Sequence, residues 1–227
     1  MKSAAHWKEL SLAVGATFAL GLALPAAAVV ITFDDVVVSP TNVIMTAETS
    51  GGFNFTSSHF HIINSPTSCG FGGCVSNGTQ YAAEDAPTLA GPVTMALAGG
   101  GTFSLLSFDG AEMWLNSAAA AVGTADGPFP NALAIHVVGN LSGGGTIATD
   151  FLLDQIKDGA GGLPDFQTFL FGAGWTDLSS VVWSGTDAQG GLASMAFDNI
   201  NAAVPEPSTL LLLAAGLLGF AGWRRRG

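Results

Sequence analysis

The chain has 227 residues, of which 48% are hydrophobic and 10% are charged, and its formal net charge is −11. All but two of its 17 acidic residues lie in the segment 29–203, where Lys157 is the only basic residue. This balance argues against a nucleic-acid partner and disfavours an anionic membrane surface, because contacts to phosphates need a basic surface. The acidic surface could attract divalent cations, or it could serve only to keep a hydrophobic chain soluble.

The first 28 residues have the pattern of a secretory signal peptide. Two lysines are followed by the apolar stretch Leu10–Leu24, which Pro25 ends, and Ala26–Ala28 provide small residues before a cleavage site. This order of a basic, an apolar and a small-residue region is typical of export signals. We expect cleavage after Ala28, with an uncleaved N-terminal anchor as the alternative.

The segment 29–203 has the length of one domain and the pattern of an all-β protein. Short runs rich in Val, Phe, Thr and Ile alternate with turns rich in Gly, Asn, Asp and Ser. The predicted strands are Val29–Phe33, Asn42–Ala47, Gly52–Thr56, His59–Ile63, Val93–Leu97, Thr102–Phe108, Ala111–Leu115, Leu133–Val138, Thr146–Leu153, Phe166–Phe171, Ser180–Trp183 and Met195–Ile200. A change in the alternation of apolar residues predicts a bulge or corner near Leu105. Many short strands with Gly-rich turns favour a jelly-roll-like β-sandwich.

The only two cysteines, Cys69 and Cys74, flank the glycine-rich run Gly70–Gly73. In an oxidising compartment an even number of cysteines points to a disulfide, and the glycines allow the tight turn that it needs. A zinc site would require further ligands nearby. We therefore predict a disulfide that fixes this loop and stabilises the fold by about 2–3 kcal/mol.

Oxygen-bearing side chains at the two ends of the β domain form a candidate calcium site. Asp34 follows the first predicted strand, and Asp198 and Asn199 lie in the last one. The terminal strands of such sandwiches are often neighbours, so hard oxygen ligands from both could bind one calcium ion. In the alternative, Asp198 and Asn199 cap turns through hydrogen bonds to the backbone.

No motif in the β domain indicates catalysis. The GxSxG motif of serine hydrolases is absent, and the glycine clusters lack the Lys and Ser or Thr of a phosphate-binding loop. Glycoside hydrolysis needs two carboxylates at a set separation in a cleft. Adjacent acids such as Glu84 and Asp85 diverge when they lie on a strand.

Two histidines allow two interpretations. His59 and His61 are two residues apart, so their imidazoles point to the same face of a strand. With a third ligand they could hold a metal ion. Otherwise they form a polar outer face, while Phe60 and Ile62 pack inward.

Aromatic side chains at the surface would indicate carbohydrate binding, because their rings stack on sugar rings. The candidates are Trp175, Trp114 and Tyr81. Trp175 follows a Gly-Ala-Gly run and is expected on a loop or a strand edge. Each of the three could instead pack in the core.

The C-terminal segment 204–227 has three parts in a fixed order. The first is a Pro-Glu-Pro triplet, formed by Pro205, Glu206 and Pro207. The uncharged segment 208–223 is rich in Leu and Ala, which predicts a short transmembrane helix rather than a buried helix of a soluble domain. It is followed by three arginines, Arg224, Arg225 and Arg226. Arginines beside an apolar helix tend to remain on the cytoplasmic side.

This arrangement closely resembles the PEP-CTERM protein-sorting signal of Gram-negative bacteria. The resemblance implies processing by an exosortase, a membrane transpeptidase-like enzyme, and a cargo that often accompanies exopolysaccharide or biofilm matrix. The runs Val30–Asp34, Gly101–Asp109 and Phe197–Ile200 also resemble parts of exported PEP-CTERM cargo domains. That second resemblance implies a galactose-binding-like or lectin-like sandwich.

Together these features predict an exported surface or extracellular-matrix protein without catalytic activity. It is expected at the inner membrane with residues 29–203 on the periplasmic side, and at the cell surface or outside the cell after processing. Its expected partners are an exosortase, the membrane and an extracellular polysaccharide. A carbohydrate-binding module acting on exopolysaccharide is the first alternative, and a secreted hydrolase is the second.

Overall fold

The structure is a computed structural model that describes residues 26–38, 43–64, 75–84, 91–113, 131–156, 165–206 and 216. Nearly all of them belong to one compact unit, Ala28–Val204. The strands are β1 (Ala27–Ile31), β2 (Val43–Ser50), β3 (Phe53–Ile63), β4 (Tyr81–Glu84), β5 (Val93–Leu97), β6 (Ser104–Glu112), β7 (Ala134–Leu141), β8 (Thr146–Leu152), β9 (Gln167–Leu170), β10 (Leu178–Thr186), β11 (Leu192–Ala193) and β12 (Met195–Val204). Every regular element in the described part of this unit is a strand, so the all-β prediction is confirmed.

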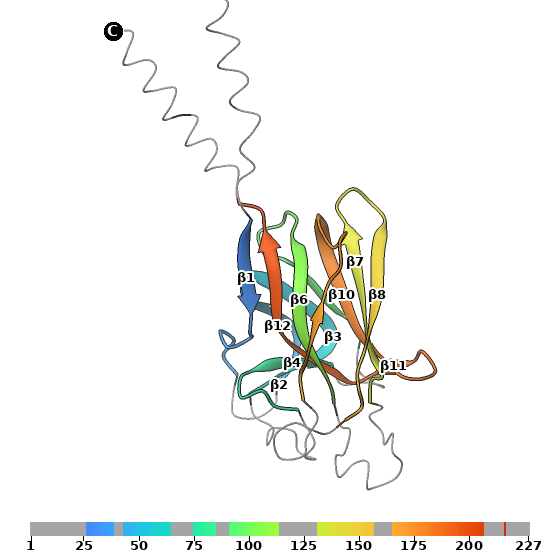
Figure 1. The fold of residues 1–227 in the computed structure, drawn as a ribbon. Coiled ribbons are helices and arrows are strands. Elements are labelled where there is room, and N and C mark those ends of the chain that lie inside the picture. Colours follow the sequence, from blue (N-terminus) through green and yellow to red (C-terminus); the bar gives the residue numbers. More distant parts are fainter. Residues whose placement is uncertain are drawn as a thin grey trace, which may run out of the picture. The chain divides into compact units, whose positions relative to one another are not determined.

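The strands form a single sheet that curls on itself (Figure 1). Its hydrogen-bonded order is β8-β7-β10-β5-β3-β4-β12-β6-β9. Beside this path, β1 pairs with β12, β2 pairs with β3, and β11 pairs with β10. The two ends of the path approach each other, because the rings of Phe151 in β8 and Phe169 in β9 lie 5.2 Å apart. The sheet is therefore nearly a closed barrel.

β3 changes its partner halfway along. Residues 53–56 pair with β5, whereas residues 60–63 pair with β4, which in turn pairs with β12. A jelly-roll sandwich has two separate sheets, but this change of partner joins the strands into one. The predicted strands 52–56 and 59–63 are the two halves of β3, and the sequence divides them where the partner changes.

The predicted bulge lies in β6. Leu105 and Ser107 pair with successive residues of β12, so Leu106 is an extra residue on β6. This allows both Leu105 and Phe108 to face the core, while Leu106 is 43% exposed. β12 has its own irregularity here, where Asn199 adopts a left-handed backbone conformation with φ 47°.

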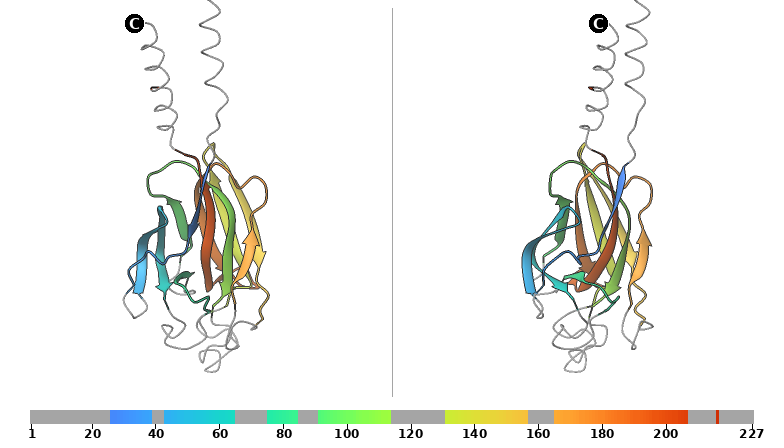
Figure 2. Two further views of the ribbon diagram at one scale, coloured as in Figure 1. Left: turned by 60° about the vertical axis from the view of Figure 1, so that its left-hand side comes forward. Right: turned by 90° about the vertical axis from the view of Figure 1, so that its left-hand side faces the viewer.

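Aromatic side chains hold opposite sides of the curled sheet together. Trp183 of β10 stacks on Phe197 of β12, with ring centroids 5.4 Å apart and an interplanar angle of 7°. Phe108 of β6 packs edge-on against Trp183 at 4.9 Å. Figure 2 shows β2 and β3 on one side of this interior and β8 and β9 on the other. A second, smaller cluster consists of Ile63, Val75, Tyr81, Ala83, Ala111, Met113 and Ala196.

Two strands, β4 and β11, were not predicted. β4 reads Tyr-Ala-Ala-Glu and has no β-branched residue, so its strand propensity is low. β11 has two residues. Both are strands because longer neighbours supply their hydrogen-bond partners. β4 pairs with β3 and with β12, and β11 pairs with β10.

Candidate functional site

The buried side chain of Asp198 on β12 is hydrogen-bonded to exposed side chains of the segment that precedes β4. Its Oδ2 accepts hydrogen bonds from Nδ2 of Asn77 at 2.7 Å and from the hydroxyl of Thr79 at 3.2 Å. The backbone N–H of Gln80 donates to Oδ1 of Asp34 at 3.0 Å. The segment 77–80 thus links the turn after β1 to the last strand.

The predicted calcium ligands are brought together only in part. Asp34 and Asp198 contact the same segment, 77–80. Burial raises the pKa of Asp198 to about 6, hydrogen bonds to its carboxylate oppose this, and the charge of Asp34 adds to the rise. Asn199 points elsewhere, because its Nδ2 donates to Oδ2 of Asp109 at 2.8 Å. Sequence reasoning missed the Asn-Gly-Thr turn at 77–79, whose side chains hold Asp198.

Two glutamates, Glu84 on β4 and Glu112 on β6, lie inside the sheet. Both are paired in register with Met195 of β12, from opposite sides, so all three side chains lie on one face. Met195 belongs to the main core, and both glutamates have 0% exposure. The sequence did not reveal this pair, because only the register of β4, β12 and β6 brings the two residues together.

Each of these glutamates has one hydrogen-bonded oxygen. Oε2 of Glu84 accepts the N–H of Gly185 in β10 at 3.1 Å, and Oε1 of Glu112 accepts the backbone N–H of Gln155 at 2.7 Å. The other two oxygens are buried without a hydrogen-bond partner among the described residues. Burial raises the pKa of Glu84 to about 8, against the effect of the Gly185 hydrogen bond. Burial also raises the pKa of Glu112. Glu84 is therefore mainly an uncharged carboxylic acid at neutral pH.

His59 and His61 of β3 share one face, as predicted, with their rings 4.8 Å apart at 87°. Phe60 and Ile62 belong to the main core on the other face. The two histidines are buried, at 8% and 6% exposure, rather than forming a polar outer face. Within the described ranges, no three His, Cys, Asp or Glu side chains are arranged to hold a metal ion.

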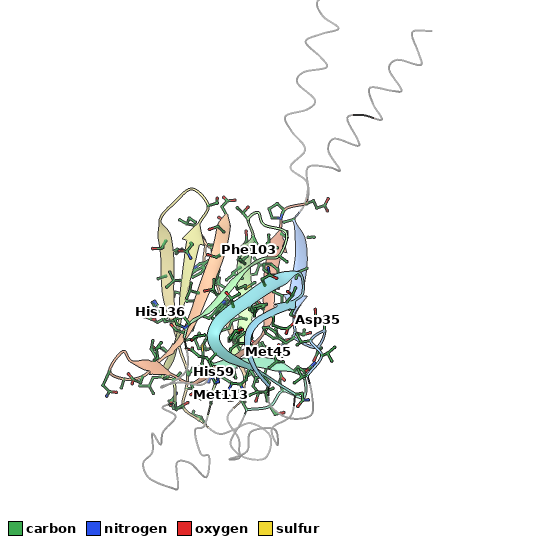
Figure 3. The ribbon with its side chains drawn as sticks, turned by 180° about the vertical axis from the view of Figure 1, so that it is seen from behind. Asp35, Met45, His59, Phe103, Met113 and His136 are labelled. Carbon is green, nitrogen blue, oxygen red and sulfur yellow. The ribbon has the colours of Figure 1, made fainter. Side chains whose placement is uncertain are left out.

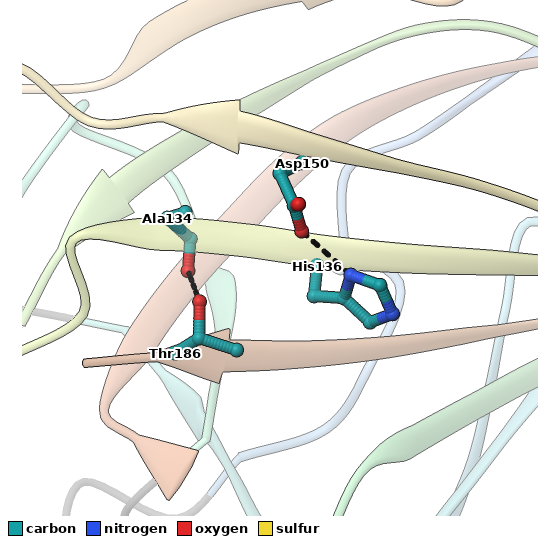
Figure 4. A network of polar contacts seen from close by, with 4 residues as sticks. All are labelled: Ala134, His136, Asp150 and Thr186. Carbon is teal, nitrogen blue, oxygen red and sulfur yellow. Dashed lines mark hydrogen bonds and ion pairs between the residues drawn. The ribbon is translucent and has the colours of Figure 1, made fainter. Parts of the chain in front are cut away.

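The remaining histidine of the β domain, His136, stands apart from His59 (Figure 3). Its Nδ1 lies 2.6 Å from Oδ1 of Asp150, which faces it in register from β8 (Figure 4). Beside this pair, the hydroxyl of Thr186 donates to the carbonyl of Ala134 at 3.4 Å. Both members of the His–Asp pair are exposed, so the contact is a surface interaction of small energetic weight.

Two of the aromatic candidates are part of the packed interior. Trp175 is 4% exposed and packs against Phe171 at 4.6 Å. Tyr81 is 1% exposed, and its hydroxyl donates to the carbonyl of Val75 at 2.7 Å. Neither ring is available to stack on a sugar at the surface. Trp114 lies outside the described residues.

The last strand leads directly into the C-terminal triplet. β12 ends at Val204 because the next residue, the exposed Pro205, has no N–H with which to continue the hydrogen-bond ladder. Glu206 is also described and is partly exposed. Outside the described residues lie Pro207, Arg224, Arg225, Arg226, Cys69, Cys74, residues 1–25 and, apart from Gly216, the predicted transmembrane segment 208–223.

Residues 203–226 match the family described as the PEP-CTERM protein-sorting motif. This chain carries a PEP-CTERM sorting motif. The PEP-CTERM motif starts within the last two residues of β12 and continues beyond the sheet. It implies an exported protein that an exosortase processes. No curated protein matches the chain.

Among solved structures, the chain is similar to a DUF4465 family protein from Bacteroides caccae, with 11% identity and a TM-score of 0.48. The alignment covers 79% of this chain and 100% of that one. The described residues include no helix long and apolar enough to cross a bilayer, and of the predicted membrane helix 208–223 they include only Gly216.

Proposed function

We propose that the chain is a surface or extracellular-matrix protein without catalytic activity, whose β domain is the cargo of its PEP-CTERM motif. The position of that motif is the main support. The match begins at residue 203, and the compact unit ends at Val204. An exosortase acting at or beyond the exposed Pro205 would not need to open the sheet.

In the proposed topology, residues 208–223 span the inner membrane and Arg224–Arg226 remain in the cytoplasm. The β domain is then on the periplasmic side, since the arginines hold the C-terminal end inside. Its surface carries almost no positive charge, which keeps it from adhering to anionic lipid headgroups. Release by the exosortase would free such a cargo for the cell surface or the matrix.

The burial of two glutamates, Glu84 and Glu112, supports a cargo that is not an enzyme. Glu84 and Glu112, which the register of the sheet places on either side of Met195, are both buried, whereas glycoside hydrolysis needs two carboxyl groups in a cleft that the substrate can enter. A polysaccharide cannot reach them while the sheet is intact. A carbohydrate-binding role would depend on residues such as Trp114, since Trp175 and Tyr81 belong to the interior.

Replacement of the Pro-Glu-Pro triplet by three alanines tests the proposed processing. In a host that has an exosortase, this variant should enter the membrane normally but should yield no shortened product on mass analysis. Glu48→Ala, which changes an acidic residue on β2, is the matched control and should be processed like the parent. Normal shortening of the triplet variant would contradict the proposal.

A pull-down on the host's exopolysaccharide separates the proposed function from its alternative. If the protein has no carbohydrate-binding role, the immobilised polysaccharide should not retain it. Saturable retention that is lost on Trp114→Ala would favour the carbohydrate-binding module instead.

A further inference from the structure

Three segments that are distant in sequence meet around one buried carboxylate. Asp198 lies near the middle of β12, Asp34 lies in the turn after β1, and residues 77–80 precede β4. Hydrogen bonds from Asn77 and Thr79 reach Asp198, and one from Gln80 reaches Asp34. Two carboxylates are thus held on one short segment.

The hydrogen bonds leave one oxygen of each carboxylate unused. Oδ2 of Asp198 accepts the side-chain bonds from Asn77 and Thr79, whereas Oδ1 has no partner within hydrogen-bond distance and angle among the described residues, although Asp198 is 0% exposed. Asp34 accepts the Gln80 amide at Oδ1, so its Oδ2 remains able to bind a further group. A buried carboxylate oxygen without a donor or a cation is costly.

No side-chain cation balances these charges in the part of the chain that the structure describes. Those residues include no lysine or arginine, and Lys157, the only basic residue between positions 29 and 203, lies outside them. His136 is paired with Asp150 on β7 and β8, and His59 is packed against its neighbour on β3. A proton or a bound cation could therefore offset the charge of Asp198.

We propose that Asp34 and Asp198 bind a calcium ion against the segment 77–80. The available donors are carboxylate, amide, hydroxyl and backbone oxygens, and an all-oxygen set favours a hard cation over zinc or copper. Two carboxylates correspond to the weak calcium sites of extracellular modules, with Kd of about 0.1–1 mM. Asn199 is not part of this site, because its side chain is bonded to Asp109.

Calcium at this site joins the turn after β1 and the segment before β4 to the last strand. All three segments belong to the compact unit Ala28–Val204, so the ion stabilises the cargo itself. This role does not depend on exosortase processing. A protein that is never processed should still bind calcium.

Thermal unfolding of the full chain in detergent, with calcium or with EDTA at equal ionic strength, tests the proposal. A ligand at ten times its Kd that binds only the folded state raises the folding equilibrium constant about 11-fold. For a domain of this size the Tm should rise by about 3–5 °C. Asp34→Asn and Asp198→Asn should each abolish the rise. Asp177→Asn, an equal change of charge in the turn before β10, should retain it.

Equilibrium dialysis against radioactive calcium provides a readout that does not rely on the stability of the variants. The parent and Asp177→Asn should bind one ion per chain, and Asp34→Asn, which changes an exposed side chain, should bind none. Absence of binding to the parent, or binding that survives Asp34→Asn and Asp198→Asn, would overturn the proposal. A Tm that rises on acidification and is unaffected by calcium would assign the balancing charge to a proton.

Discussion

Glu84 should dominate the pH dependence of the stability of the β domain. Its pKa is about 8 in the folded protein, against an ordinary value of 4.5, so the folded state binds this proton more tightly than the unfolded state. The resulting stabilisation is complete below pH 4.5 and is lost as the pH rises through about 8. Between these limits each pH unit lowers the free energy of unfolding by about 1.4 kcal/mol, or about 3 kcal/mol from pH 5 to pH 7.

Glu84→Gln removes this titration and keeps the size of the side chain. The amide oxygen of glutamine can still accept the N–H of Gly185, which bonds the carboxyl group in the parent. The variant should match the parent near pH 5 and should exceed it by about 2–3 kcal/mol at pH 7. Urea unfolding of both proteins at pH 5, 6, 7 and 8, followed by tryptophan fluorescence, measures the difference. Titration of the other groups contributes equally to both curves.

Glu48→Gln is the matched control, because Glu48 lies on β2 and, within the part of the chain that the structure describes, its carboxylate accepts a hydrogen bond only from the adjacent amide of Thr49. This control should follow the parent at every pH. The reasoning would be refuted if Glu84→Gln differed from the parent by the same amount at pH 5 and pH 8.

Two further substitutions test the packing of the sheet and the surface contacts. Gly185→Ala should lower the free energy of unfolding by at least about 1–3 kcal/mol, because the added Cβ would lie 2.0 Å from the carbonyl oxygen of Ala193. Gly143→Ala should change this free energy little, because its added Cβ would have no atom within 4 Å. Urea denaturation compares the two, and equal stabilities would contradict the predicted clash. His136→Ala should lower the free energy of unfolding by less than about 1 kcal/mol, since its pair with Asp150 is exposed, and a larger loss at high salt would show another role for the ring.

Local patterns predicted the strands where side-chain alternation is regular. β5 has the predicted limits, Val93–Leu97, and the bulge near Leu105 follows from a visible change of phase. The closure of the sheet could not be predicted in the same way. It depends on β3 changing partners and on β4, a short strand in which Ala82, Ala83 and Glu84 have low strand propensity.

The candidate sites show the same division between local and long-range information. Asp34 and Asp198 could be related from sequence, because Asp34 follows the first strand, Asp198 lies in the last one, and these strands pair. The roles of Asn77 and Thr79 depend on where their turn lies in the fold. The Glu84–Glu112 pair depends on the register of three strands, and no spacing in the sequence encodes that register. The C-terminal motif was the easiest to find, since its parts are contiguous.

Fractionation of the native host, with and without its exosortase, tests the central claim most directly. With the enzyme, the β domain should be found shortened at the cell surface or in the medium. Without it, the full-length chain should remain in the inner-membrane fraction, with residues 29–203 accessible to protease from the periplasm. A chain that is soluble and of unchanged length in both strains would contradict the account.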